Sequence, residues 1–89
     1  MLRYRVAFYL PAQPGGMVVA EALDFPGALT QGFDLADARS MVASAMEDLA
    51  DSLLEDGKPL PTPNPCIQPE DIPDLIEFIP LSVHAGALR

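Results

Sequence analysis

The sequence predicts an α+β domain in two layers, with one long helix packed on a small antiparallel sheet in the order β-β-β-α-β. Its 89 residues allow one domain, expected to span 1–89. Three strand-like segments near the N-terminus are joined by short connections, which favours an antiparallel meander. An amphipathic helical segment and a fourth strand-like segment follow, and together these elements can enclose one core.

The first two strands are expected at residues 3–10 and 17–23. Apolar side chains alternate along the first segment, as in a half-buried strand: Tyr4, Val6, Phe8 and Leu10. The second segment contains adjacent β-branched valines. Residues 11–16 between them consist mostly of turn formers, so we expect a loop there.

The strongest local signals lie between residues 24 and 38. Pro26 presets φ for the second position of a turn and Gly27 supplies a positive φ for the third, so they predict a type II turn. A short third strand is expected at residues 28–31. Gly32 is then expected to allow a sharp change of direction.

A helix is expected over residues 35–55. Asp34 is its expected N-cap, with Asp37 in the reciprocal position of a capping box. Gly57 is expected just beyond the C-terminal end, before a proline that prevents continuation. Apolar residues recur at helical spacing and form one stripe: Leu35, Ala38, Val42, Ala45, Met46, Leu49 and Leu53.

Acidic side chains occupy the opposite side of this helix. They continue into its last turns, where the macrodipole favours basic groups, and several repel one another at i, i+4 spacing. Residues that lower the stability of a helix without a visible local compensation suggest a function. We therefore expect a partner-binding surface on the helix, formed by Glu47, Asp48, Asp51 and Glu55. The second choices are Glu21 and Asp24, and a merely solvated helix face is the alternative.

Prolines interrupt residues 58–73 so often that neither a helix interior nor a central strand fits. We expect an extended surface connector there, with a Pro-rich ligand for a groove-binding module as the alternative. A last strand is expected over residues 75–83, where Pro80 favours an edge position or a bulge.

Charge and composition exclude several classes of function. Thirteen acidic and five basic residues give a formal net charge of −8. Direct nucleic-acid binding is not expected, because it depends on Lys and Arg. A basic protein partner complements this charge, although the charge can also serve solubility alone. We expect a cytoplasmic protein without membrane association, because no apolar run approaches the roughly 20 residues of a membrane span and no signal peptide is evident.

Signals for catalysis are weak, and we expect no enzyme activity, cofactor or metal. His84 and Cys66 are the single histidine and cysteine, which excludes the usual Cys/His zinc sites and an intrachain disulfide. No Ser- or Cys-centred motif accompanies His84. Glu21, Asp24 and Asp34 are the nearest candidates for a nuclease-type metal site.

The order and spacing of several segments resemble the HicB-like antitoxins. These segments are Val18-Val19-Ala20-Glu21, Asp24-Phe25-Pro26-Gly27, Thr30-Gln31-Gly32 and, after the acidic helix, residues 53–61. The resemblance covers residues 4–61. It implies a partial ribonuclease-H-like sheet without nuclease activity. It also implies a role in binding and masking a small basic RNA-cleaving toxin of the HicA type.

The sequence departs from the family pattern in three places. Ala28 stands where a Cys is common, and Phe33-Asp34 stands where the family favours Asp-Thr. Many relatives continue into an operator-binding domain, which is not expected here, so promoter autoregulation is not expected either.

Two other functions stay open: a stand-alone homo-oligomeric regulatory or structural protein of the same fold, and a metal-dependent nuclease remnant. Exposed sheet edges tend to self-associate. We therefore expect a homodimer or a larger homo-oligomer, lined by Tyr4, Phe8 and the final strand.

Overall fold

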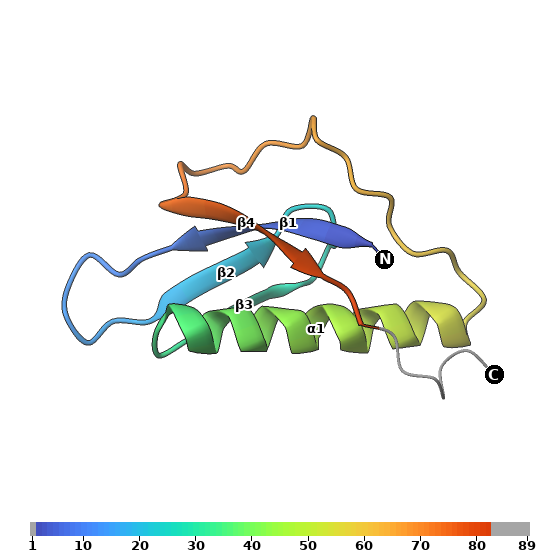
Figure 1. Cartoon of the computed structure of the whole chain (residues 1–89), viewed down its shortest axis with the longest axis horizontal. Helices are drawn as coiled ribbons and strands as arrows, with labels where there is room; N and C mark the ends of the chain where they lie inside the picture. Colours follow the sequence, from blue (N-terminus) through green and yellow to red (C-terminus); the bar gives the residue numbers. More distant parts are fainter. Residues whose placement is uncertain (1, 83–89) are drawn as a thin grey trace.

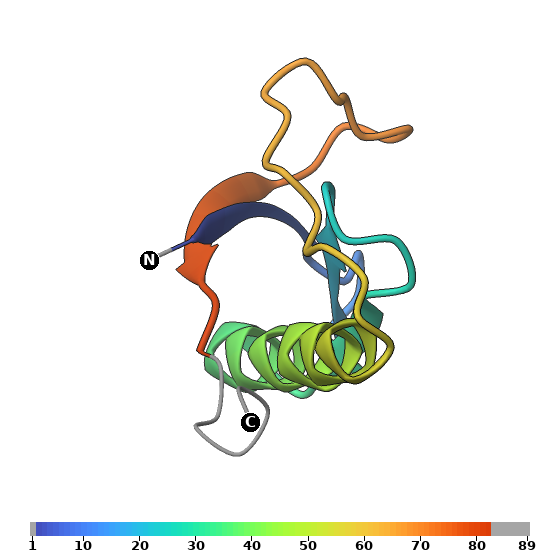
Figure 2. The ribbon, with the colours of Figure 1, turned by 90° about the vertical axis from the view of Figure 1, so that its right-hand side faces the viewer.

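The computed structural model describes residues 2–82 and confirms the predicted β-β-β-α-β architecture (Figure 1). The elements are β1 (Arg3–Tyr9), β2 (Val18–Ala22), β3 (Leu29–Gly32), α1 (Leu35–Glu55) and β4 (Leu75–Pro80). The strands form one antiparallel sheet in the order β3-β2-β1-β4. Figure 2 shows the sheet curving over α1, which covers one of its faces.

The hydrophobic core lies between the inner face of the sheet and α1. The largest fully buried side chains are Tyr4, Phe8, Phe25, Met46, Val6 and Val42. The Tyr4 and Phe25 rings meet edge to face, with centroids 5.0 Å apart. The expectation that Tyr4 and Phe8 line an assembly interface is therefore wrong, because both are 0% exposed within one chain. Leu10, expected on the same inward face, lies beyond the end of β1 and is 48% exposed.

The turn before β3 has the predicted geometry. Gly27 has a φ of 92°, and the Ala28 N–H donates to the Phe25 carbonyl at 3.0 Å. Gly32 is required for a different reason from the one predicted. A Cβ at this position would lie 2.4 Å from the Ala38 nitrogen. A glycine here thus allows β3 to end directly against the first turn of α1.

Both ends of α1 are capped at the predicted residues. The Asp34 carboxylate accepts the Asp37 N–H at 2.7 Å. The Asp37 carboxylate in turn accepts the N–H of Phe33 at 2.9 Å, one residue earlier than in a standard capping box. At the other end Gly57 adopts a φ of 71°. The N–H groups of Gly57 and Lys58 then donate back to the last turn of the helix.

Residues 58–74 form the predicted extended connector. They leave α1 and pass to the outer face of the sheet, which is the face turned away from the helix (Figure 2). Arg5 on this face donates to two connector carbonyl oxygens at 2.8 and 2.7 Å. These bonds hold the Pro-rich segment against the sheet without regular secondary structure.

Strand β4 is at the edge of the sheet, as Pro80 predicted. It ends at Pro80, and the last residue of the expected strand, Val83, lies outside the described residues. On its inner face Glu77 accepts two hydrogen bonds from the Arg39 guanidinium, each 2.7 Å long. This ion pair, which the sequence did not predict, ties the edge strand to α1.

Candidate functional site

The predicted acidic helix residues lie away from the buried side of α1. That side buries Ala38, Val42, Met46 and Ala50. Asp48 and Glu55 are exposed, whereas Glu47 and Asp51 are half-buried. Spacings of three and four residues place these four carboxylates along one side of the helix, which we call the acidic helix face.

Asp51 differs from its neighbours on this face. Its Oδ1 atom is shielded from solvent and accepts no hydrogen bond within residues 2–82. A buried acceptor left without a donor costs about 1–3 kcal/mol.

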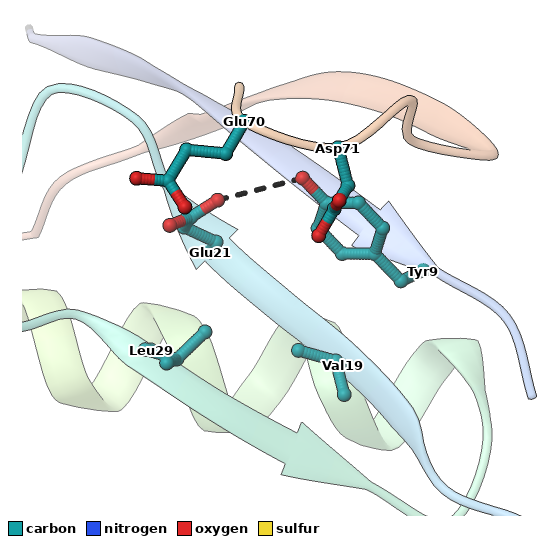
Figure 3. A pocket seen from close by; sticks show the side chains of 6 residues that line it. All are labelled: Tyr9, Val19, Glu21, Leu29, Glu70 and Asp71. Atoms are coloured by element: carbon teal, nitrogen blue, oxygen red, sulfur yellow. Dashed lines mark hydrogen bonds between the residues drawn. The ribbon is translucent and has the colours of Figure 1, made fainter.

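The other predicted carboxylates have different surroundings. Glu21 lies on the outer face of the sheet, at a pocket of about 370 Å³. We call this pocket the outer-face pocket. Its lining residues come from β1, β2, the start of β3 and the connector (Figure 3): Tyr9, Val19, Glu21, Leu29, Glu70 and Asp71.

The outer-face pocket combines an apolar floor with converging carboxylates. Val19 and Leu29 lie on one side, and Leu29 is 63% exposed. In Figure 3 the carboxylates of Glu70 and Asp71 reach from the connector toward Glu21 and the Tyr9 ring. The floor can contact the aliphatic stem of a Lys or Arg side chain, while the carboxylates accept from its charged end.

The electrostatics of the outer-face pocket favour a cation. The Tyr9 hydroxyl lies 3.5 Å from Glu21 Oε1, which is a long hydrogen bond. Burial raises the pKa of Tyr9, and the negative charges of Glu21, Asp71 and Glu70 raise this pKa further. The tyrosine therefore stays a neutral donor, and the negative field that disfavours its ionisation attracts a positive side chain.

Asp24 is 4% exposed and lies beneath the connector. Its Oδ1 accepts the N–H of Asn64 at 2.9 Å, whereas Oδ2 accepts no hydrogen bond in the described part of the chain. The pKa of Tyr4 is raised by burial and by the Asp24 charge. Asp24 thus links the turn before β3 to the connector by a hydrogen bond. That Asp24 contacts a partner stays a prediction.

The three carboxylates considered for metal-dependent catalysis do not come together. Glu21 lines the outer-face pocket, Asp24 lies beneath the connector, and Asp34 caps α1. Among residues 2–82, no group of three or more His, Cys, Asp or Glu residues is arranged to hold a metal ion. Cys66 is exposed, and His84 lies outside the described residues. No helix in the described ranges is long and apolar enough to span a membrane.

Sequence reasoning missed two members of the outer-face pocket, Glu70 and Asp71. They follow Pro69 in a segment without hydrophobic periodicity, so nothing local indicated which surface they meet. The adjacent acids themselves were the available signal, because the connector has to cross the sheet between α1 and β4.

Comparisons with known proteins confirm the fold. No protein-family model matches the sequence, and no curated protein matches it. Among solved structures, the chain is similar to the crystal structure of the Burkholderia pseudomallei antitoxin HicB. The TM-score is 0.74 at 20% identity, over 98% of this chain and 67% of that chain. The protein thus has the HicB-like fold that the sequence motifs predicted.

Proposed function

We propose that this protein is a non-enzymatic, antitoxin-like binder that masks a small basic RNA-cleaving toxin of the HicA type. The fold shared with the B. pseudomallei antitoxin HicB carries the proposal. The net charge of −8 supplies its physical basis. A protein that cleaves RNA needs cationic side chains to hold phosphates, and an acidic cover complements that surface.

The basic side chains near the sheet are largely engaged within the protein. Arg5 holds the connector and Arg39 pairs with Glu77. The carboxylates at the outer-face pocket and on the acidic helix face are disposed toward the surface. A basic partner therefore meets a predominantly negative field, which accelerates encounter at low salt.

Two acidic surfaces compete for the toxin, and they lie on opposite faces of the molecule. Sequence reasoning placed the acidic helix face first. The geometry favours the outer-face pocket, because its carboxylates converge above an apolar floor, whereas those of the helix are spread along a convex cylinder. We propose the pocket as the main contact and retain the acidic helix face as the second candidate.

The test is co-expression with a small basic protein of the HicA type, taken from an adjacent reading frame if one encodes it, followed by a pull-down and a growth assay. We expect the two proteins to copurify and the growth arrest caused by the toxin to be relieved. The purified chain alone is expected to leave RNA intact with or without Mg²⁺. Failure to copurify or to restore growth contradicts the proposal.

The second candidate function is a stand-alone homo-oligomer of the same fold. The exposed apolar side chains of edge strand β4 favour it, since Phe78 is 62% exposed and Ile76 is 44% exposed. Copurification with the toxin separates the two functions, because a stand-alone oligomer binds copies of itself and no toxin.

A further inference from the structure

The free edge of β4 combines apolar side chains with unused backbone groups. In the part of the chain that the structure describes, β4 pairs with β1 on one side and ends the sheet on the other. Ile76 and Phe78 are exposed on its outer face. An open, apolar edge of this kind is a template for another strand.

Hydrogen bonds identify which β4 residues point outward. The Leu23 N–H donates to the Arg5 carbonyl, so the backbone N–H and C=O groups of odd-numbered β1 residues point toward β2. Even-numbered positions of β1 therefore face β4, and the Leu81 N–H indeed donates to the Leu2 carbonyl. The backbone N–H and C=O groups of residues 75, 77 and 79 accordingly point toward β1. The N–H and C=O groups of Ile76 and Phe78 point away from the sheet.

We propose that β4 pairs antiparallel with β4 of a second copy of this chain, with Ile76 of each copy opposite Phe78 of the other. This register uses every outward N–H of β4 and joins the two sheets across a two-fold axis at Glu77. A register with Phe78 opposite Phe78 sets Ile76 against Pro80, which has no N–H. A register with Ile76 opposite Ile76 sets Phe78 against Asp74, whose N–H already donates to Phe8.

Side chains on the outer face complement one another in this arrangement. Each Phe78 ring lies beside Ile76 of the other copy, a favourable aromatic and β-branched pair. The guanidinium of Arg3, which pairs with Pro80 at the C-terminal end of β4, lies 5.7 Å from the Phe78 ring centroid and makes this end of the strand positive. Asp74 precedes the other end of the strand and is exposed. Antiparallel pairing brings the Arg3 end of one copy beside the Asp74 end of the other.

The inner face brings the two Glu77 residues opposite each other at the two-fold axis. Like charges directly opposite are unfavourable, but each carboxylate is already paired with Arg39 of its own helix. Arg39 therefore supports the dimer although it does not lie on the sheet edge. This inference does not depend on the proposed toxin partner.

The first test measures the oligomeric state of the full chain by sedimentation velocity over a range of concentrations. We expect a monomer–dimer equilibrium. Ile76→Pro removes an outward N–H that β1 does not use, and the symmetric dimer loses two hydrogen bonds. The dissociation constant should rise about tenfold or more. Ile76→Thr, which keeps the N–H, is the control for lost apolar contact and should weaken the dimer less. A monomer at all concentrations, or a dimer indifferent to Ile76→Pro, overturns the proposal.

The second test determines the register by cross-linking in a Cys66→Ser background. Residues at position 77 face each other with Cα atoms about 4.5 Å apart, within the range that a disulfide spans. Glu77→Cys should therefore give a covalent dimer under mild oxidation. Ile76→Cys should not, because the two copies of residue 76 are diagonal neighbours roughly 7–8 Å apart. The opposite result overturns the register even if one of the proline or threonine variants fails to fold.

Discussion

Gly32 decides how closely the sheet and the helix approach. It ends β3 where the backbone of Ala38 begins the first turn of α1. Backbone atoms, unlike the end of a flexible side chain, cannot move aside without shifting the helix. One missing Cβ atom thus allows the junction that leads from the sheet into α1.

We expect Gly32→Ala to lower the free energy of unfolding by about 1–3 kcal/mol, as overpacking does elsewhere. The added Cβ would lie 2.4 Å from the Ala38 nitrogen. Urea denaturation measures the effect. Gly15→Ala is the comparison, because Gly15, unlike Gly32, lies in the left-handed region at φ 85° and has no atom within 4 Å of an added Cβ, so its loss reports backbone strain without a clash. A smaller loss at Gly32 than at Gly15 contradicts this account of the junction.

Local backbone preferences made some residues predictable and others not. Gly27, Asp34 and Gly57 have the predicted roles, because a positive φ or a helix cap depends on neighbours in the sequence. The reason for Gly32 and the bond from Asn64 to Asp24 were not predicted. Both depend on approaches between segments, the second across 40 positions, which no local pattern encodes.

At the scale of elements, the ion pair between Arg39 and Glu77 joins α1 to the edge strand. Hydrogen bonds from Arg39 hold the pKa of Glu77 below its ordinary value, although partial burial acts in the opposite direction. Because the folded-state pKa is the lower one, the pair stabilises the fold fully above pH 4.5. That contribution is lost as the pH falls through the folded-state pKa.

Glu77→Gln is therefore expected to lower the free energy of unfolding near neutral pH and to have little effect once Glu77 is protonated. Urea denaturation of both proteins from about pH 7 downward measures the difference. The effect should be modest and weaker in high salt, since the two side chains are 42% and 29% exposed. Glu70→Gln, which removes a charge outside this pair, is the control. A difference that persists unchanged in strong acid contradicts the assignment.

Element order and strand pairing followed from the sequence because periodicity and short loops determine them. The path of residues 58–74 could not be predicted from the sequence, because prolines exclude regular secondary structure without specifying where the chain runs. Glu70 and Asp71 were missed for this reason. The outer-face pocket thus became visible once the connector was seen to cross the sheet.

At the scale of the whole molecule, the helix side and the sheet side both carry carboxylates. The core residues between them are apolar, and Asp24 is the buried charged residue among those described. A small basic partner can cover one side and leave the other in solvent. The free edge of β4 lies between these two sides and stays open to a second copy of the chain.

The central claim is that an acidic surface of this protein masks a basic toxin. Calorimetric titration of the toxin tests it with three variants, each of which changes the net charge by the same amount. The outer-face pocket variant carries Glu21→Gln, Glu70→Gln and Asp71→Asn. The acidic helix face variant carries Asp48→Asn, Asp51→Asn and Glu55→Gln. The control adds lysines at exposed positions that belong to neither surface: Ala12→Lys, Gln13→Lys and Thr62→Lys.

We predict that the pocket variant binds the toxin about tenfold more weakly or worse, because lost charge pairs at an interface cost several kcal/mol. The control should bind nearly as well as the unmodified protein. A loss confined to the acidic helix face variant moves the contact to the helix and keeps the claim. Equal affinity for all four proteins, or an equal loss in the control, contradicts it.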